Sequence, residues 1–214
     1  MPNLQAEVQA ERTEQADLLA TLTPEQWNAP TLSAGWRVRE VIAHTTAPFR
    51  MSLGRTVWEL TRARGDINRM ADRLARRDAA RLSPAELLAA LRDNITHPWA
   101  PPGDGPRAAL SHDVIHGLDI TVGLGLDRRP PPERVALVLA GLRPKNAKFF
   151  GADLTGVRLE ATDLDWVYGT GEPLRGLAQD LLLVVCGRHL PPGRLTGESA
   201  TRFNAPALRP RPRP

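Results

Sequence analysis

The strongest indication of the fold lies in residues 107–122, which read RAALSHDVIHGLDITV. Leu110, Val114 and Leu118 recur every four residues, the spacing that places apolar side chains on one face of an α-helix. The segment follows the turn-forming residues PPGDGP at 101–106 and ends at a glycine. The pattern predicts one helix of a helical bundle, with its apolar stripe against a core.

Two histidines, His112 and His116, lie four residues apart on this predicted helix. At that spacing the side chains project from one face, about 6 Å apart along the axis, so both imidazoles can bind one metal ion. Histidines four residues apart also occur on solvated helix faces. Asp119, one turn beyond His116, is a candidate hydrogen-bond acceptor for a ligand imidazole, although a polar residue near a helix end needs no such role.

A third histidine, His44, lies on another predicted helix. At about 100° per residue it is about 60° around that helix from Val41, near the edge of the apolar stripe, and it can face the interior of the bundle. Three neutral imidazoles from two helices form a three-ligand site with an open position, the arrangement of catalytic rather than structural zinc. The other two histidines, His97 and His189, have no predicted helical partner and are interpreted as non-ligands.

Further helices are expected on both sides of these segments. Apolar spacing predicts helices over residues 4–22, 38–60, 67–81, 84–91 and 133–142, with a kink at Pro48 in the second of them. Residues 157–173, VRLEATDLDWVYGTGEP, favour extended strands and a glycine-rich turn, and residues 174–187 then return to a helical pattern.

The chain is therefore expected to be mainly α, with a helical bundle over residues 1–148 and a small C-terminal α/β domain over residues 149–208. Residues 209–214 alternate arginine and proline. Because every second residue there lacks an amide hydrogen, we expect a disordered tail.

The composition excludes several classes of function. The 214 residues carry a formal charge of only +4, and the arginine-rich run at 62–81 is interleaved with aspartates, which is typical of a solvated helix face rather than a nucleic-acid site. No run approaches the roughly 20 apolar residues that span a bilayer, and the N-terminus lacks the pattern of a signal peptide. The single cysteine, Cys186, follows an apolar run, so we expect a buried structural thiol and a cytoplasmic protein.

Several stretches along nearly the whole chain share one resemblance. They are LTPEQW at 22–27, GWRVREV at 35–41 followed by Ala43-His44, SHDVIHGLDI at 111–120, and LEATDLDWVYGTGEPLRGLAQDLLLVVCGR at 159–188. Together they resemble the mycothiol-dependent maleylpyruvate isomerase family of DinB-like four-helix bundles, and the last stretch is similar to the small C-terminal α/β domain of that family.

The resemblance implies that His44 and His116 are metal ligands, while His112 stands where the isomerase has a glutamate. A site of three imidazoles carries one more positive charge, which favours a bound anion such as a thiolate. The implied metal is zinc, with nickel or another divalent ion as alternatives. Arg188 occupies a position similar to a Gly-Arg step of the family. There it either binds a carboxylate of substrate or thiol or interacts as a cation with the end of a helix.

The implied function is a metal-dependent enzyme that uses mycothiol for S-transfer to, or isomerisation of, a small electrophilic substrate. Its partners are then that substrate and the thiol. A non-catalytic metal-bearing protein of the same fold, serving as a ligand carrier or sensor, is equally compatible with an open three-histidine site. A purely structural bundle with incidental histidines is the third alternative, and it predicts a protein without stoichiometric metal.

Overall fold

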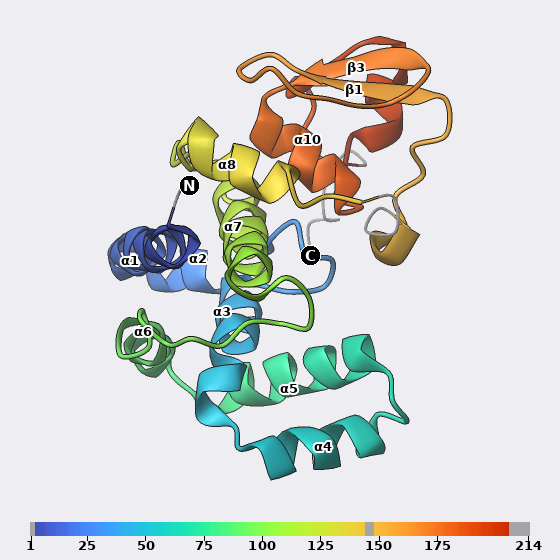
Figure 1. Ribbon diagram of the computed structural model, residues 1–214. Helices are drawn as coiled ribbons and strands as arrows, with labels where there is room; N and C mark the ends of the chain where they lie inside the picture. Colours follow the sequence, from blue (N-terminus) through green and yellow to red (C-terminus); the bar gives the residue numbers. More distant parts are fainter. Residues whose placement is uncertain (1–2, 144–147, 206–214) are drawn as a thin grey trace, which may run out of the picture. The chain divides into compact units, whose positions relative to one another are not determined.

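The computed structural model describes residues 3–143 and 148–205, and Figure 1 shows its ribbon. The chain divides into two compact units, residues 1–130 and 131–214. The first unit is helical, and the second combines helices with a small sheet. The expected fold class, mainly α with a small C-terminal α/β segment, is confirmed. The predicted disordered tail at 209–214 lies outside the described residues.

The first unit contains a series of helices joined by short loops. They are α1 (Leu4–Thr21), α2 (Pro24–Trp27), α3 (Val38–Thr46), the 3₁₀ helix η1 (Ala47–Arg50), α4 (Leu53–Arg62), α5 (Ile67–Arg81), α6 (Pro84–Arg92) and α7 (Gly105–Gly123).

Local capping explains where several of these helices begin. At the start of α6, Ser83 and Glu86 form a reciprocal capping box, and Pro84 occupies the first turn, where a missing amide hydrogen costs nothing. Thr23 and Gln26 make the same arrangement before α2. These pairs supply partners for backbone groups that a helix end would otherwise leave unsatisfied.

Five helices make the main contacts around the core of the first unit. The α1 helix contacts α6 and α7, and α3 contacts the same two helices and also α5. The side chains that fill this core are Ala16, Leu19, Trp27, Val38, Val41, Ile42, Ala43, Ala79, Leu87, Leu91 and Ile120. Burial of these apolar side chains is the main term that holds the helices together.

One sequence prediction in this unit is wrong. Residues 38–60 do not form a single kinked helix, because α3 ends at Thr46, η1 follows, and a separate α4 begins at Leu53. Pro48 has no amide hydrogen to continue an α-helix. Ser52 then caps the new helix by accepting a hydrogen bond from the backbone N–H of Arg55 at 3.3 Å, so the break is built into the sequence.

The second unit consists of helices and a four-stranded mixed sheet. Its elements are α8 (Pro132–Leu139), β1 (Val157–Ala161), β2 (Val167–Gly169), β3 (Glu172–Gly176), α10 (Ala178–Val185), β4 (Leu195–Thr196) and η2 (Glu198–Phe203). The strand order is β2-β1-β3-β4, with β1 parallel to β3 and the other pairs antiparallel.

Two boundaries in this part differ from the sequence prediction. Leu174 belongs to β3, where it is buried opposite Leu159 of β1, so the last helix begins at Ala178 rather than at 174. The division into units falls after Pro130 and gives α8 to the second unit, where it packs on α10. The sequence placed that helix in the bundle and the boundary near residue 148. Among the described residues, no helix is both long enough and apolar enough to cross a membrane.

Candidate metal centre

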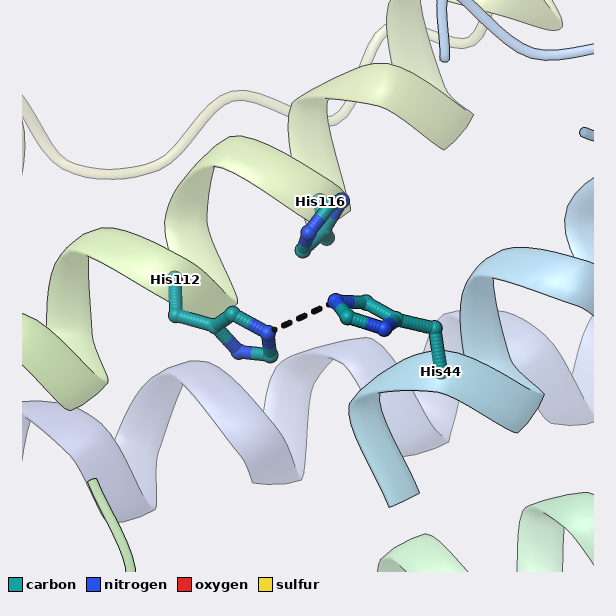
Figure 2. A group of neighbouring side chains, drawn as sticks. All are labelled: His44, His112 and His116. Carbon is teal, nitrogen blue, oxygen red and sulfur yellow. Dashed lines mark hydrogen bonds between the residues drawn. The ribbon is translucent and has the colours of Figure 1, made fainter. Parts of the chain in front are cut away.

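Three histidines from two helices converge in the first unit. Figure 2 shows His44 on α3 facing His112 and His116 on successive turns of α7. One ring nitrogen from each can be chosen so that all three atoms lie within 4.8 Å of one another. The cluster can therefore hold a metal ion.

The spacing of these nitrogens suits a tetrahedral metal. Nε2 of His44 lies 3.1 Å from Nε2 of His112. Zinc–nitrogen bonds of about 2.0–2.1 Å at tetrahedral angles place two ligand nitrogens roughly 3.3–3.4 Å apart. The rings of His116 and His44 are 4.9 Å apart between centroids, and those of His116 and His112 are 4.8 Å apart. A small inward adjustment of these side chains would complete a three-nitrogen set.

Carboxylates set the proton positions of both α7 histidines. Nδ1 of His116 lies 3.1 Å from Oδ2 of Asp119, and Nδ1 of His112 lies 3.1 Å from Oδ1 of Asp113. A carboxylate only accepts hydrogen bonds, so each imidazole carries its proton on Nδ1 and presents the lone pair of Nε2. Asp119 lies where the sequence placed a hydrogen-bond acceptor. Asp113 was not predicted, because adjacent residues on a helix do not face each other.

Asp113 is itself held by an arginine that lies far from it in the sequence, near the N-terminus. Nε of Arg12, on α1, donates to Oδ2 of Asp113 at 2.7 Å, and both side chains are almost fully enclosed. Nη1 of Arg12 also donates to the backbone carbonyl of His97 at 2.8 Å. Arg12 thus compensates the charge of Asp113 and fixes the carboxylate beside His112. No local pattern signals this pairing, because 101 residues separate the partners.

The α1 and α7 helices approach closely beside this pair. Nε2 of Gln15 donates to the backbone carbonyl of Asp113 at 2.7 Å and to Oε1 of Glu11 at 2.8 Å. A Cβ at Gly117 would lie 2.7 Å from the same Gln15 nitrogen, which is shorter than a normal contact. Gly117, the residue after His116, therefore permits the polar contact that sets the position of α7.

The segment before α3 is attached to α7 as well. The backbone N–H of Leu32 donates to the carbonyl of Asp119 at 3.0 Å. A Cβ at Gly123 would lie 2.9 Å from Cα of Thr31, so the close approach of the two segments requires glycine there. The backbone thus ties the start of α3 to the helix that carries the other two histidines.

Two tryptophans line the histidine cluster. The Trp36 ring lies 5.0 Å from that of His44, and its Nε1 donates to Oδ1 of Asp72 at 2.8 Å. The Trp99 ring meets His112 edge to face at 5.5 Å. Large aromatic walls exclude water and strengthen the electrostatic interactions of the nitrogens they enclose. Neither tryptophan is among the site residues expected from the sequence.

The surroundings keep His44 neutral. Burial, followed by the neighbouring His116 and His112, holds the pKa of His44 well below its usual value. Desolvation disfavours the imidazolium ion, and so does repulsion from any neighbouring imidazole that takes up a proton. The neutral imidazole is the form that binds a metal, so the site is prepared for a cation rather than a proton.

The other residues singled out from the sequence lie in different surroundings. His97 accepts a hydrogen bond at Nδ1 from the backbone N–H of Trp99 at 3.1 Å, and His189 is exposed. Neither belongs to the histidine cluster found in the described residues. Cys186 is buried, as expected. Arg188 lies in the second unit, where Nη1 donates to the carbonyl of Cys186 at 3.0 Å, at the end of α10. This contact fits the interpretation as a helix-end cation, and the carboxylate-binding role stays a prediction.

Comparison with known proteins gives one family and one fold. Residues 8–110 match the family described as mycothiol maleylpyruvate isomerase N-terminal domain, a range that contains His44 and ends just before His112. Among curated proteins, no sequence match was found.

Two solved structures share the fold. The crystal structure of the mycothiol-dependent maleylpyruvate isomerase aligns with a TM-score of 0.62 at 13% identity, over 95% of this chain and 93% of that chain. A histidine-to-alanine mutant of that enzyme aligns with a TM-score of 0.55 at the same identity and coverage. This chain thus has the fold of that isomerase, and its residues 8–110 match the model of the mycothiol maleylpyruvate isomerase N-terminal domain family.

Proposed function

We propose that this protein is a metal-dependent enzyme that uses a low-molecular-weight thiol, mycothiol, to transfer sulfur to a small electrophilic substrate or to isomerise it. The observation that carries the proposal is the convergence of three imidazoles whose nitrogens lie within 4.8 Å of one another. The match of residues 8–110 and the shared fold support the choice of thiol and of reaction class in this proposal.

The residues of the chain have separate tasks in this proposal. His44, His112 and His116 would hold a divalent cation, and zinc suits an all-imidazole set with an open position. Such a cation, when bound, lowers the pKa of a coordinated thiol so that the thiolate exists near neutral pH. Asp119 and Asp113 keep the protons of two imidazoles on Nδ1. Trp36 and Trp99 restrict water around the cluster.

The same chemistry suggests the compartment. Thiol-dependent reactions need a reducing environment, and the sequence has one cysteine, which is buried. We therefore place the protein in the cytoplasm, with the thiol and a small electrophile as its partners.

Metal content is the first test. The purified parent protein and the His44→Ala and His112→Ala variants are analysed for zinc, nickel and other divalent metals by elemental analysis. We expect about one ion per parent chain and a loss in both variants. His189→Ala, which removes an exposed histidine outside the cluster, is the matched control and should keep the metal. Negligible metal in the parent protein would contradict the proposal and favour a structural bundle.

Turnover is the second test. Metal-loaded protein is incubated with mycothiol and electrophiles of several classes, and products are identified by mass spectrometry. We expect a conjugate or isomer whose formation stops after the metal is removed with a chelator and returns when the metal is restored. A protein that keeps its metal but forms no product with any electrophile would instead be a binding protein of the same fold.

A further inference from the structure

The first unit also contains a concave site, and none of the residues that line it belongs to the histidine cluster. An open hollow of about 260 Å³ is bordered by η1, α4 and the end of α5, the helices drawn in cyan and green-blue in Figure 1. Four arginines line it together with one aspartate and two apolar residues. The five charged side chains are Arg50, Arg55, Arg77, Asp78 and Arg81.

The carboxylates in and beside this hollow do not balance its arginines. Asp78 is shared, since Nη1 of Arg50 lies 2.7 Å from Oδ2 and Nη2 of Arg77 lies 2.7 Å from Oδ1. Glu59, behind the hollow, pairs with Arg73 and also accepts from Nη1 of Arg77 at 3.1 Å. The positive charges of the hollow therefore exceed the negative charges available to them.

Two of the lining arginines keep their donors available. Nη2 of Arg55 is 3.9 Å from Oε1 of Glu59, too far for a hydrogen bond. The guanidinium of Arg81 makes no hydrogen bond or ion pair with any residue of ranges 3–143 and 148–205. A cation in the last turn of α5 is favoured by the helix dipole, but that effect does not explain four arginines around one hollow.

From these observations we propose that the hollow binds a small oxyanion with two negative charges, of the class of phosphate monoesters. Guanidinium groups offer paired N–H donors that match phosphate oxygens. A concave surface of one charge sign concentrates the field and raises the local concentration of counter-ions. The volume is below the roughly 300–1,000 Å³ of clefts that hold drug-sized ligands, so it suits a charged head group. The arginines come from three elements, which suits a tetrahedral anion better than a planar one.

Titration calorimetry with inorganic phosphate tests this proposal. Phosphate is titrated into the full-length, metal-loaded protein at low ionic strength, because salt screens charges at a surface. We expect one site per chain and an affinity that falls about tenfold in Arg81→Gln and again in Arg55→Gln. Both side chains are exposed, so these variants should fold. Arg62→Gln, which removes an exposed arginine of α4 that does not line the hollow, should bind phosphate like the parent.

Two further titrations, one with a variant and one with other anions, test where the anion binds and which class of anion is preferred. His44→Ala disrupts the histidine cluster and should leave phosphate binding intact, so this result is independent of the proposed enzyme activity. Phosphate binding that is lost in His44→Ala but kept in Arg81→Gln would overturn the proposal. Succinate, a flexible dicarboxylate whose charges lie on two separate planar carboxylate groups, should bind more weakly than phosphate. Equal, non-saturating heats from phosphate, succinate and chloride would show mere ionic screening and would also overturn it.

Discussion

Two regions of the first unit place a buried carboxylate beside arginine, but in opposite surroundings. Between α1 and α7, the side chains of Arg12 and Asp113 are 1% and 6% exposed. Between α4 and α5, Glu59 is also buried, yet its partner Arg73 is 34% exposed. The first pair is closed off from water and positions a histidine of the candidate metal centre. The second pair is open on one side, where water and salt can compete.

The apolar residues show the same contrast. On α3, Val41 and Ile42 are fully buried in the core. On α4, Leu53 and Val57 are 80% and 57% exposed, while the inward-facing side chain is that of Glu59. Apolar packing therefore holds α3, whereas ion pairs hold α4 against α5. Exclusion of water, rather than the number of ion pairs, should govern how strongly each region resists perturbation.

Breaking the enclosed pair should have the largest effect. Arg12→Met leaves the Asp113 carboxylate buried without compensation, so we expect the free energy of unfolding to fall by about 3–5 kcal/mol. Urea denaturation measures this loss. The double variant Arg12→Met/Asp113→Asn removes the stranded charge and should recover part of the stability. A loss below about 1 kcal/mol would show that water reaches the pair.

Matched apolar truncations compare the two helices directly. Ile42→Ala empties a fully buried position on α3 and should cost about 2–5 kcal/mol. Val57→Ala on α4 should change the free energy of unfolding by less than about 0.5 kcal/mol, because the side chain is already largely in water. Equal losses in thermal or urea denaturation would mean that another surface covers α4 in solution.

Loss of the hydrogen-bond acceptor of His116, Asp119, should have an intermediate effect. The quantity expected to change is the metal affinity, not the stability of the fold. Asp119→Asn weakens the hydrogen bond that holds the His116 proton on Nδ1. Such changes typically reduce metal affinity about 10–100-fold. Competition with a chromogenic chelator measures the dissociation constant. Asp17→Asn, at an exposed carboxylate on α1, is the control. An equal change of the dissociation constant in both variants would show that Asp119 has no specific effect on metal binding.

The smallest effect is expected at the open pair. Arg73→Met removes one partner of Glu59 but leaves Arg77 bonded to it, so we expect a loss of at most about 1 kcal/mol. Raising the salt concentration should shrink this difference, because ions screen partly exposed charges. Denaturation at about 0.05 M and 0.5 M salt tests it. A loss as large as that of Arg12→Met would erase the contrast between the two regions.

Local spacing predicted the parts of the candidate site that depend on helical geometry. The four-residue separation of His112 and His116, and the three-residue step from His116 to Asp119, are properties of one helix and can be calculated from the sequence. The position of His44 at the edge of an apolar stripe followed from the same periodicity. The structure brings all three imidazoles together, while their action as ligands stays a prediction for metal analysis.

Parts that depend on the tertiary structure or on competing local signals could not be predicted in this way. Arg12 reaches Asp113 across 101 residues, and no period or motif encodes that distance. The sequence does not distinguish a break after Thr46 from a kink, because apolar residues continue at helical spacing through Leu53. The structure shows that the later apolar side chains Leu53 and Val57 face solvent. Leu174 was assigned to a helix because its burial in β3 depends on pairing with β1.

The contact between Arg12 and Asp113 also bears on the order in which the protein folds. The two residues can meet only after the chain between them closes a loop of about 100 residues, which costs about 4 kcal/mol of chain entropy before any constant term. Helices α3 and α7 can each form locally at much lower cost. Arg12 can therefore fix the carboxylate behind His112 only once the N-terminal helix has docked. Metal captured during synthesis would meet a looser set of imidazoles than metal captured by the finished fold.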